Sequence, residues 1–276
     1  MTTKYTAVKK ISYDELGDIY DEPVVITDFA EKWQARYLWS FDFFSKNYGN
    51  LPVKVYDDSF SKQGGKYLKH TKEMTFGDYI KLITNGDSHL RLFLFDLIKT
   101  APELKKHINI PQRFGKMANL NLFMFFGGVG ATPPTHYDVD MPHVFHTVLC
   151  GQKEVYLFHP NQSYNLHQHP FTVRSYVDPR NPDLNRFPRF IHSSGWHCRL
   201  NEGETLLIPS GFWHKIYYQS PSFSISLRHY ERKKIVKGIY NLLVNEKIDL
   251  FFNKVAKDKW FSWKQNKAGE IINVNK

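Results

Sequence analysis

The sequence predicts a mainly β fold with flanking helices. Capped helical segments and short apolar runs alternate over residues 12–86, and runs typical of β-strands dominate residues 144–231. After Arg232 apolar residues return at helical spacing. The prediction is therefore an antiparallel β core with N-terminal helices and a helical C-terminal appendage.

The N-terminal helices are predicted from their caps. Ser12 and Glu15 form a capping-box pattern for a short first helix. A second helix begins after Ser40 and ends at Gly49, and a third begins after Thr75, with Asp78 three residues later. Apolar runs between and after these helices predict strands at 23–29, 51–58, 89–97 and 119–128.

The β core is predicted from a hairpin and two further strands. "VFHTVLCGQKEVYLFHP" (144–160) contains two β runs about a Gly-Gln turn, and strands are expected in 204–218 and 222–231. Residues 161–201 are rich in Pro, Asn, Arg and His, and they predict a long functional loop with surface histidines, including those of "HQH" (167–169).

The C-terminal segment is predicted to be helical and basic. Ile235, Ile239 and Leu242 lie on one helical face, and residues 249–263 look like a second amphipathic segment. Residues 231–276 hold eleven Lys/Arg and five Asp/Glu, so they carry most of the net charge of +10. A basic tail can attract nucleic acid or an acidic peptide, although a solvated lysine-rich helix surface is the ordinary explanation. The domain prediction is one domain over 1–230, which includes the N-terminal helices and strands, and a helical segment over 231–276 that is a possible dimerisation element.

Composition limits the class of protein. No apolar run of the 276-residue chain reaches the length of a membrane span, and the first residues lack a secretory pattern. The two cysteines do not make a disulfide framework, which favours a reducing cytoplasm. We therefore expect a cytoplasmic protein without membrane contacts.

The stretch "TPPTHYDVDMPHVFH" (132–146) suggests a metal site. If His136 and Asp138 lie on one strand, their i, i+2 spacing points both side chains to the same face. His214 in "IPSGFWHKI" is the best third ligand. Two imidazoles and one carboxylate form the facial triad of non-heme Fe(II) oxygenases, which leaves coordination positions open. Asp140 is not expected to bind the metal, because a fourth protein ligand takes one of those positions, and His146 is expected to be a core histidine.

Several motifs carry a resemblance to a known family. "PVVITDF…WSFDFFSKNYGNLPVKVY", "THYDVD…VFHTVLCGQKEVYLFHP", "YVDPRNPDLNRFPRF" and "LLIPSGFWHKI" resemble, in this order, segments of the JmjC/cupin-like 2-oxoglutarate oxygenases. The branch most similar is that of the asparaginyl hydroxylase called factor inhibiting hypoxia-inducible factor, over roughly residues 8–230. The resemblance implies a double-stranded β-helix, or jelly roll, with Fe(II) held by His136, Asp138 and His214.

The resemblance also implies a site for 2-oxoglutarate. Lys153 in "GQK" is expected to pair with the distal carboxylate of this cosubstrate, since a buried carboxylate needs a cation. The family's co-binding threonine is expected at Thr132, with Thr135 as the second choice. Arg228 is expected either to hold the metal-binding end of the cosubstrate, or to face solvent or pair with Glu231.

The implied activity is hydroxylation of a protein or peptide side chain with Fe(II), 2-oxoglutarate and O2. Arg174 in the long loop is a candidate substrate contact, against the ordinary reading of a solvated arginine. Two other classes of function stay open, namely hydroxylation of a modified tRNA base and a non-catalytic cupin-like binding protein. The resemblance further implies a homodimer formed through the C-terminal helices.

Overall fold

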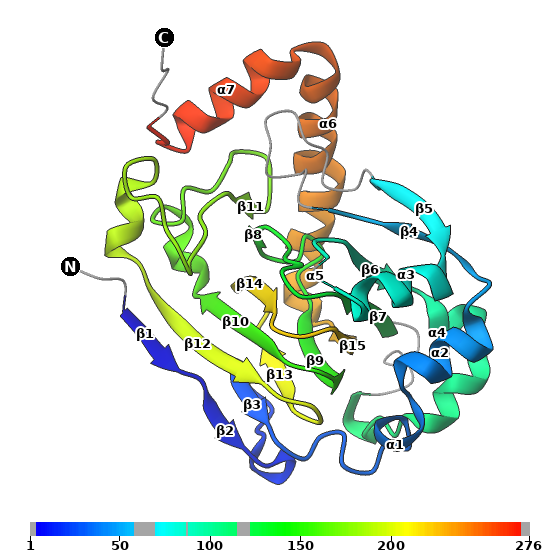
Figure 1. The fold of residues 1–276 in the computed structure, drawn as a ribbon. Helices are drawn as coiled ribbons and strands as arrows, with labels where there is room; N and C mark the ends of the chain where they lie inside the picture. The colour runs from blue at the N-terminus through cyan, green and yellow to red at the C-terminus, as the bar shows by residue number, and fades with distance from the viewer. Residues whose placement is uncertain (1–3, 58–69, 87, 115–121, 272–276) are drawn as a thin grey trace.

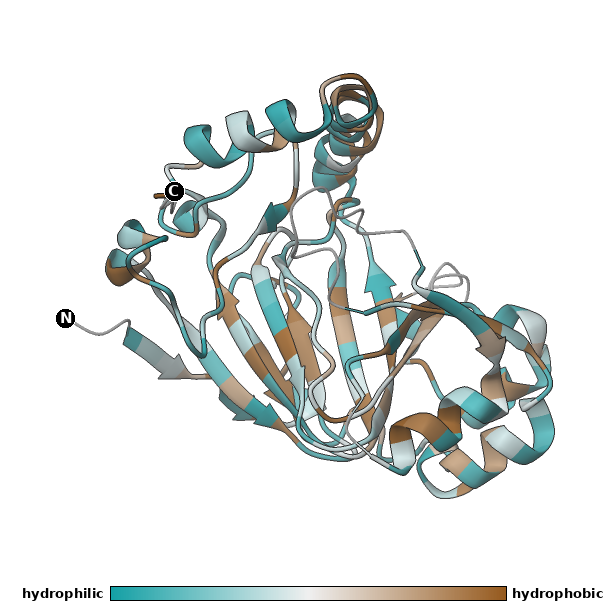
Figure 2. Cartoon of the chain, turned by 45° about the horizontal axis from the view of Figure 1, so that its top comes forward, coloured by the Kyte–Doolittle hydropathy of each residue, from teal (hydrophilic) through white to brown (hydrophobic). Residues whose placement is uncertain are grey.

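The computed structural model (Figure 1) describes residues 4–57, 70–86, 88–114 and 122–271. Within them two sheets face each other in a double-stranded β-helix (Figure 2), which confirms the predicted fold class. The first sheet has the spatial order β1 (Lys4–Ala7), β12 (Ser194–Leu200), β10 (Lys153–Phe158), β14 (Trp213–Tyr218), β8 (Thr135–His136) and β11 (Arg174–Ser175). The second has the order β2 (Lys9–Ile11), β3 (Val24–Ile26), β13 (Thr205–Ile208), β9 (His143–Cys150), β15 (Ser222–His229), β7 (Leu122–Gly127) and β6 (Arg91–Phe95).

Side chains of the second sheet alternate between two apolar environments. Phe145 and Leu149 of β9 pack in the cluster that the N-terminal segments cover, whereas Val144 and Val148 belong to the cluster between the two sheets. Because successive residues of a strand point to opposite faces, His146 also points between the sheets. The strand β9, buried at all its residues except Cys150, thus combines an outer core face with an interior face that can carry function.

The N-terminal helices pack outside the second sheet and begin where their caps predict. The Ser40 hydroxyl accepts a hydrogen bond from the Phe43 amide at 3.0 Å, and that of Thr75 accepts one from Asp78 at 3.1 Å. The capping box at Ser12 starts only a 3-10 turn, Tyr13–Glu15. The helices capped by Ser40 and Thr75 are α2 (Phe41–Tyr48) and α3 (Phe76–Thr84). The N-terminal part of the chain also contains α1 (Ala35–Leu38), α4 (Leu97–Thr100) and the β4–β5 pair, Pro52–Val55 with Lys72–Thr75.

The prediction of one long loop over 161–201 is wrong at its C-terminal end. Ser194–Leu200 forms β12, which pairs with β10 on one side and, in parallel, with β1 on the other. Trp196, Cys198 and Leu200 supply the alternating apolar positions of this strand, but Gly, His and Arg between and before them hide the pattern in the sequence. The predicted strands 51–58 and 119–128 are seen as β4 and β7, and their residues 58 and 119–121 lie outside the described residues.

The C-terminal segment folds as helices along the β core and over the 161–192 stretch (Figure 1). Its last described turn is fixed by Glu270, a buried carboxylate that accepts hydrogen bonds from His169 and from both Arg186 Nε (3.0 Å) and Nη2 (2.8 Å). His167 and His169 are therefore buried, and the expectation that they lie at the surface is wrong. No described helix is long and apolar enough to cross a membrane. The segment comprises α5 (Arg232–Tyr240), a π-helical turn (Asn241–Asn245), α6 (Glu246–Val255) and α7 (Lys257–Lys267).

Candidate functional site

Three side chains from separate places in the sequence converge at one end of the jelly roll. His136 ends β8 and pairs in register with His214 of β14, so their ring centroids lie 4.3 Å apart. Asp138 follows two residues after the end of β8, and one possible ligand atom from each of the three residues lies within 4.8 Å of the others. The three predicted ligands thus come together, although Asp138 lies in a loop and not on the strand that the i, i+2 argument assumed.

Backbone carbonyls fix the orientation of both imidazoles. His136 Nδ1 lies 2.9 Å from the Pro134 carbonyl oxygen, and His214 Nδ1 lies 3.1 Å from that of Phe212. A carbonyl can only accept a hydrogen bond, so Nδ1 carries the proton in each ring and Nε2 keeps its lone pair. This is the arrangement that a metal-binding histidine requires.

Burial also keeps the two imidazoles neutral. It holds the pKa of His136 well below its usual range, and the neighbouring His214 lowers it further. The pKa of His214 is likewise lowered by burial, an effect that Asp138 opposes. Two neutral imidazoles and a carboxylate form a donor set that suits a divalent transition metal and leaves open positions in its coordination sphere.

Arg228 binds carboxylates of the protein itself. Its Nη2 lies 3.1 Å from Asp138 Oδ1, and its Nη1 lies 2.7 Å and 2.6 Å from the two oxygens of Asp140. Of the roles expected for Arg228, the surface role and the pairing with Glu231 are wrong, because its side chain is 10% exposed and Glu231 bonds His143. Asp140, expected not to be a ligand, lies outside the three-residue ligand cluster.

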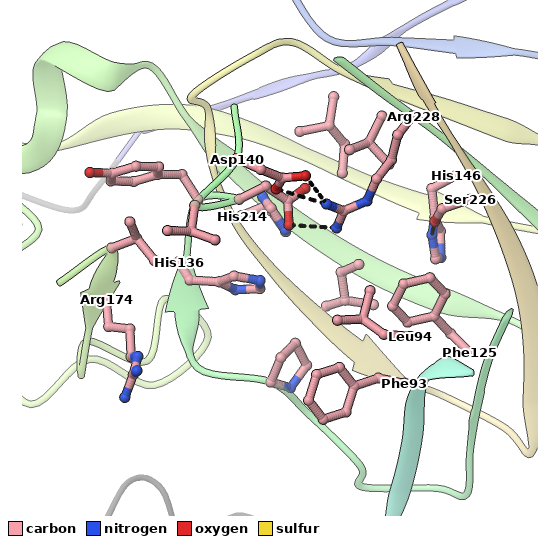
Figure 3. A pocket seen from close by; sticks show the side chains of 18 of the residues that line it. Phe93, Leu94, Phe125, His136, Asp140, His146, Arg174, His214, Ser226 and Arg228 are labelled. Atoms are coloured by element: carbon pink, nitrogen blue, oxygen red, sulfur yellow. Dashed lines mark hydrogen bonds and ion pairs between the residues drawn. The ribbon is translucent and has the colours of Figure 1, made fainter. Parts of the chain in front are cut away.

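The cluster opens into a cavity of about 250 Å³ between the sheets (Figure 3). The described wall combines the ligands with interior residues of β9, β14 and β15 and with residues near the cavity mouth from β6, β11 and the C-terminal helices. Most of the wall is apolar. Its ionisable and polar members besides the ligands are Arg91, Tyr137, Asp140, His146, Arg174, Tyr218, Ser226, Arg228 and Glu246.

Lys153 lies directly behind this wall. Its side chain is fully buried, and its ammonium group donates to Ser224 Oγ at 2.6 Å and lies 3.2 Å from His146 Nε2. It also lies 4.3 Å from the centre of the Tyr218 ring, and His146 and Tyr218 both line the cavity. Within the described ranges no carboxylate lies in ion-pair distance of Lys153, and burial holds its pKa well below its usual value. An anionic ligand beside this buried lysine would favour its charged form.

The two candidate threonines do not line the cavity. Thr135 alternates with His136 on β8 and donates to the Val177 carbonyl at 2.7 Å. Thr132 donates to the Ile216 carbonyl at 2.9 Å. Both hydroxyls are thus used in backbone contacts, and the structure does not bring them to the ligand cluster.

Arg174 lies at the cavity mouth. It pairs with His136 in the β11–β8 register and lines the cavity together with Leu242 and Glu246 of the C-terminal helices. The pKa of Glu246 is raised by burial, an effect that the nearby Arg174 partly offsets. The structure thus brings the predicted substrate contact close to the metal cluster.

Sequence reasoning indicated Arg228 but missed the two serines on the same face of β15. Ser224, Ser226 and Arg228 alternate with Ile225 and Leu227, which face the outer core. His146, expected to be a core histidine, is indeed buried and bonds Ser226 Oγ at 2.8 Å, but it also lines the cavity. The small polar residues at every second position of "SFSISLR" are the signal that could have identified this face.

A jelly roll with two histidines and one carboxylate at its end is the architecture of the cupin and JmjC proteins. The chain belongs to the cupin-like domain family, whose model matches residues 20–246. This family lies within the JmjC/cupin superfamily of Fe(II)- and 2-oxoglutarate-dependent oxygenases.

Similar proteins have names that cover several activities. JmjC domain-containing protein D of Dictyostelium discoideum is 34% identical over 239 residues, which are 75% of this chain and 51% of that protein. Lysine-specific demethylase 8 of Danio rerio is 29% identical over 222 residues, covering 74% and 52% respectively. The chain therefore spans about half the length of these two relatives. The tRNA wybutosine-synthesizing protein 5 of Gallus gallus is 27% identical over 237 residues, covering 77% of this chain and 71% of that protein.

Proposed function

We propose that the chain is an Fe(II)- and 2-oxoglutarate-dependent oxygenase that hydroxylates a side chain of a protein or peptide. The observation that carries the proposal is the cluster of His136, Asp138 and His214, which opens into a cavity of about 250 Å³. Iron bound there with the 2-oxo acid supplies O2-dependent oxidation of a substrate C–H bond.

Other residues of the chain have supporting roles in this proposal. Lys153 binds the distal carboxylate of 2-oxoglutarate as an ammonium group, because it is a buried lysine in contact with His146 and Tyr218 of the cavity wall. The apolar wall excludes water from the reacting groups. Arg174 and Glu246 lie at the mouth, where an extended substrate enters.

The direct test is incubation with Fe(II), 2-oxoglutarate and a peptide library, read by mass spectrometry. The expected product has gained one oxygen atom, while succinate forms in a substrate-dependent manner. Loss of a methyl group from a methylated peptide makes the chain a demethylase, the activity in the name of one relative. No 2-oxoglutarate turnover with any substrate contradicts the proposal and favours a non-catalytic binding protein.

Hydroxylation of a modified tRNA base is the second candidate function. It is favoured by the net charge of +10 and by the similarity to a protein named for tRNA wybutosine synthesis, which the match covers to 71%. Adding total tRNA to the same assay separates the two, because succinate then forms only with RNA.

We also propose a homodimer formed through the C-terminal segment 231–276. Large apolar side chains remain exposed on its described helices: Val236 is 71% exposed, Leu243 64% and Val255 66%. An apolar surface of this kind indicates a protein contact, and a two-fold axis lets one segment serve both sides. The lysines of the segment can extend outward with their stems on apolar surface.

The expected result for the dimer is a mass of two chains by light scattering at micromolar concentration. Leu243→Glu combined with Phe251→Glu should give a monomer, because each places a charge in the apolar surface. Ile19→Glu is the matched control: this exposed apolar residue lies outside the segment, so the variant should stay dimeric. A monomeric wild-type chain rules out the dimer.

A further inference from the structure

The loop that carries Asp138 is held in one conformation by contacts outside the ligand cluster. The Met141 amide donates to the Asp138 carbonyl at 3.1 Å, and Met141 has a φ of 59°, a left-handed conformation that is costly for a residue with a side chain. Ser210 Oγ donates to the Met141 carbonyl at 2.7 Å. A strained turn persists only where its surroundings fix it, so the position of this loop is specified by its contacts.

The C-terminal helix contributes two of these contacts. Asn241 Nδ2 donates to the Val139 carbonyl at 3.1 Å. Gly238 packs so closely that a Cβ atom there would lie 2.5 Å from the Asp140 carbonyl oxygen. The helix therefore lies directly against the backbone of the loop, and the π-helical turn that begins at Asn241 is at the point of contact.

The carboxylate of Asp140 has a complete set of partners. Arg228 donates to both of its oxygens, and the Tyr230 hydroxyl donates to Oδ2 at 2.6 Å. The remaining terminal nitrogen of Arg228 reaches Asp138 Oδ1. The guanidinium thus bridges the two carboxylates, and both of its terminal nitrogens are occupied by protein groups.

We propose that Asp140, Arg228 and Tyr230 are positioning residues that fix the Asp138 carboxylate for the metal. This inference rests on the proposed metal site. Arg228 donates to one carboxylate oxygen of Asp138 and leaves the other oxygen to bind a metal. Hydrogen-bond partners of this kind orient metal ligands. Asp140 neutralises Arg228. Without Asp140 the guanidinium has only Asp138 as a carboxylate partner and competes with the metal for it.

The same geometry argues against a direct cosubstrate role for Arg228. To bind the 2-oxo acid through the N–H groups that now donate to Asp138 and Asp140, Arg228 must release one of these two carboxylates. That exchange leaves a carboxylate without its cation in a largely apolar cavity, which is costly.

The test measures binding of Mn(II) alone, by calorimetry on the full-length protein without 2-oxoglutarate. Asp140→Asn and Arg228→Met should each weaken Mn(II) binding by about ten- to a hundredfold. Tyr230→Phe removes one hydrogen bond and should weaken it by only about two- to tenfold. Because the residues act as a unit, the Asp140→Asn/Arg228→Met double variant should lose no more affinity than the weaker-binding single variant.

Controls separate positioning from loss of the fold. Asp178, like Asp140, accepts a hydrogen bond from a tyrosine, here Tyr217, but neither residue lines the cavity. Asp178→Asn should therefore leave Mn(II) affinity unchanged. Arg228→Lys keeps the charge but not the bridge, and should bind Mn(II) weakly while keeping the wild-type unfolding temperature. At saturating Mn(II), 2-oxoglutarate affinity should change less than about threefold in Asp140→Asn, since Lys153 is intact.

Three results overturn the inference. Wild-type Mn(II) affinity in Asp140→Asn removes the positioning role, and additive losses in the double variant show that the residues do not act as a unit. Normal Mn(II) affinity with weakened 2-oxoglutarate binding in Arg228→Met makes Arg228 a cosubstrate contact. His136→Ala separates failure of this inference from failure of the proposed metal site. If His136→Ala binds Mn(II) as well as the wild type does, the metal site itself is wrong.

Discussion

Replacement of His136 by alanine should reduce 2-oxoglutarate turnover to background and abolish binding of one divalent metal ion per chain. His136 is one of the three residues that form the candidate ligand cluster in the described part of the chain, and the contact of its Nδ1 with the Pro134 carbonyl leaves Nε2 for a metal. Its side chain is a neutral imidazole on the cavity wall, so the truncation leaves no buried charge unpaired. The measurements are metal content after reconstitution with Fe(II) under nitrogen, succinate release and the thermal unfolding curve.

His192→Ala is the matched control for this variant. His192 is an exposed histidine, and its imidazole is not part of the ligand cluster. It should therefore keep wild-type metal content and turnover. Full turnover in His136→Ala contradicts the metal assignment. Protein purified in air can contain zinc or nickel, because the intrinsic affinity of such a donor set does not select iron, so each comparison needs reconstituted protein.

The cluster of candidate ligands could be predicted from sequence because its pattern is local and chemical. His136 and Asp138 lie two residues apart, and His214 follows a turn in a motif that the resemblance identifies. The strands β9 and β15 beside the cluster were also predictable, since each is a run of eight residues typical of a β-strand. The resemblance to the asparaginyl hydroxylase branch stays a prediction, because the family match is to the wider cupin-like domain.

The partners of these residues could not be predicted, because they come from distant parts of the chain. Arg228 meets Asp140 across 88 residues, and Glu270 meets His169 across 101. Nothing in the sequence near either carboxylate indicates its partner. The strand β12 was missed for a related reason: it pairs with the N-terminal β1, whose sequence "KYTA" has little apolar pattern.

Replacement of Lys153 by methionine should weaken 2-oxoglutarate binding by more than about a hundredfold. Removing one partner of a buried ion pair costs about 3–5 kcal/mol, which corresponds to this loss of affinity. Methionine has an unbranched apolar side chain, and it removes the ammonium group together with its contacts to Tyr218, Ser224 and His146. The measurement is the dissociation constant for 2-oxoglutarate in Mn(II)-loaded protein. Unchanged affinity shows that a different cation binds the distal carboxylate.

Lys264→Met is the matched control, because Lys264 is also a buried lysine but has a carboxylate partner. Its ammonium group donates to Asp249 Oδ1 at 2.5 Å, and neither residue lines the cavity. This variant should lower the free energy of unfolding, since it leaves Asp249 without its cation, and should keep wild-type affinity for 2-oxoglutarate.

The two lysine variants should also differ in the absence of 2-oxoglutarate. The folded-state pKa of Lys153 is lowered by burial, so between that pKa and the ordinary value of 10.5 the unfolded chain binds a proton that the folded chain does not. The free energy of unfolding therefore rises with pH in this window in the wild type, and this contribution is absent in Lys153→Met. The methionine variant should be at least as stable as the wild type at neutral pH without ligand.

The two proteins should also differ in their response to ligand. At a 2-oxoglutarate concentration of about a hundred times its dissociation constant, the free energy of unfolding of the wild type should rise by about 2.7 kcal/mol, and that of Lys153→Met should rise by almost nothing. Ligand-free Lys153→Met could instead lose as much stability as Lys264→Met. That result would mean that Lys153 stabilises the fold through its bonds to Ser224 and His146 and does not serve to bind an anion.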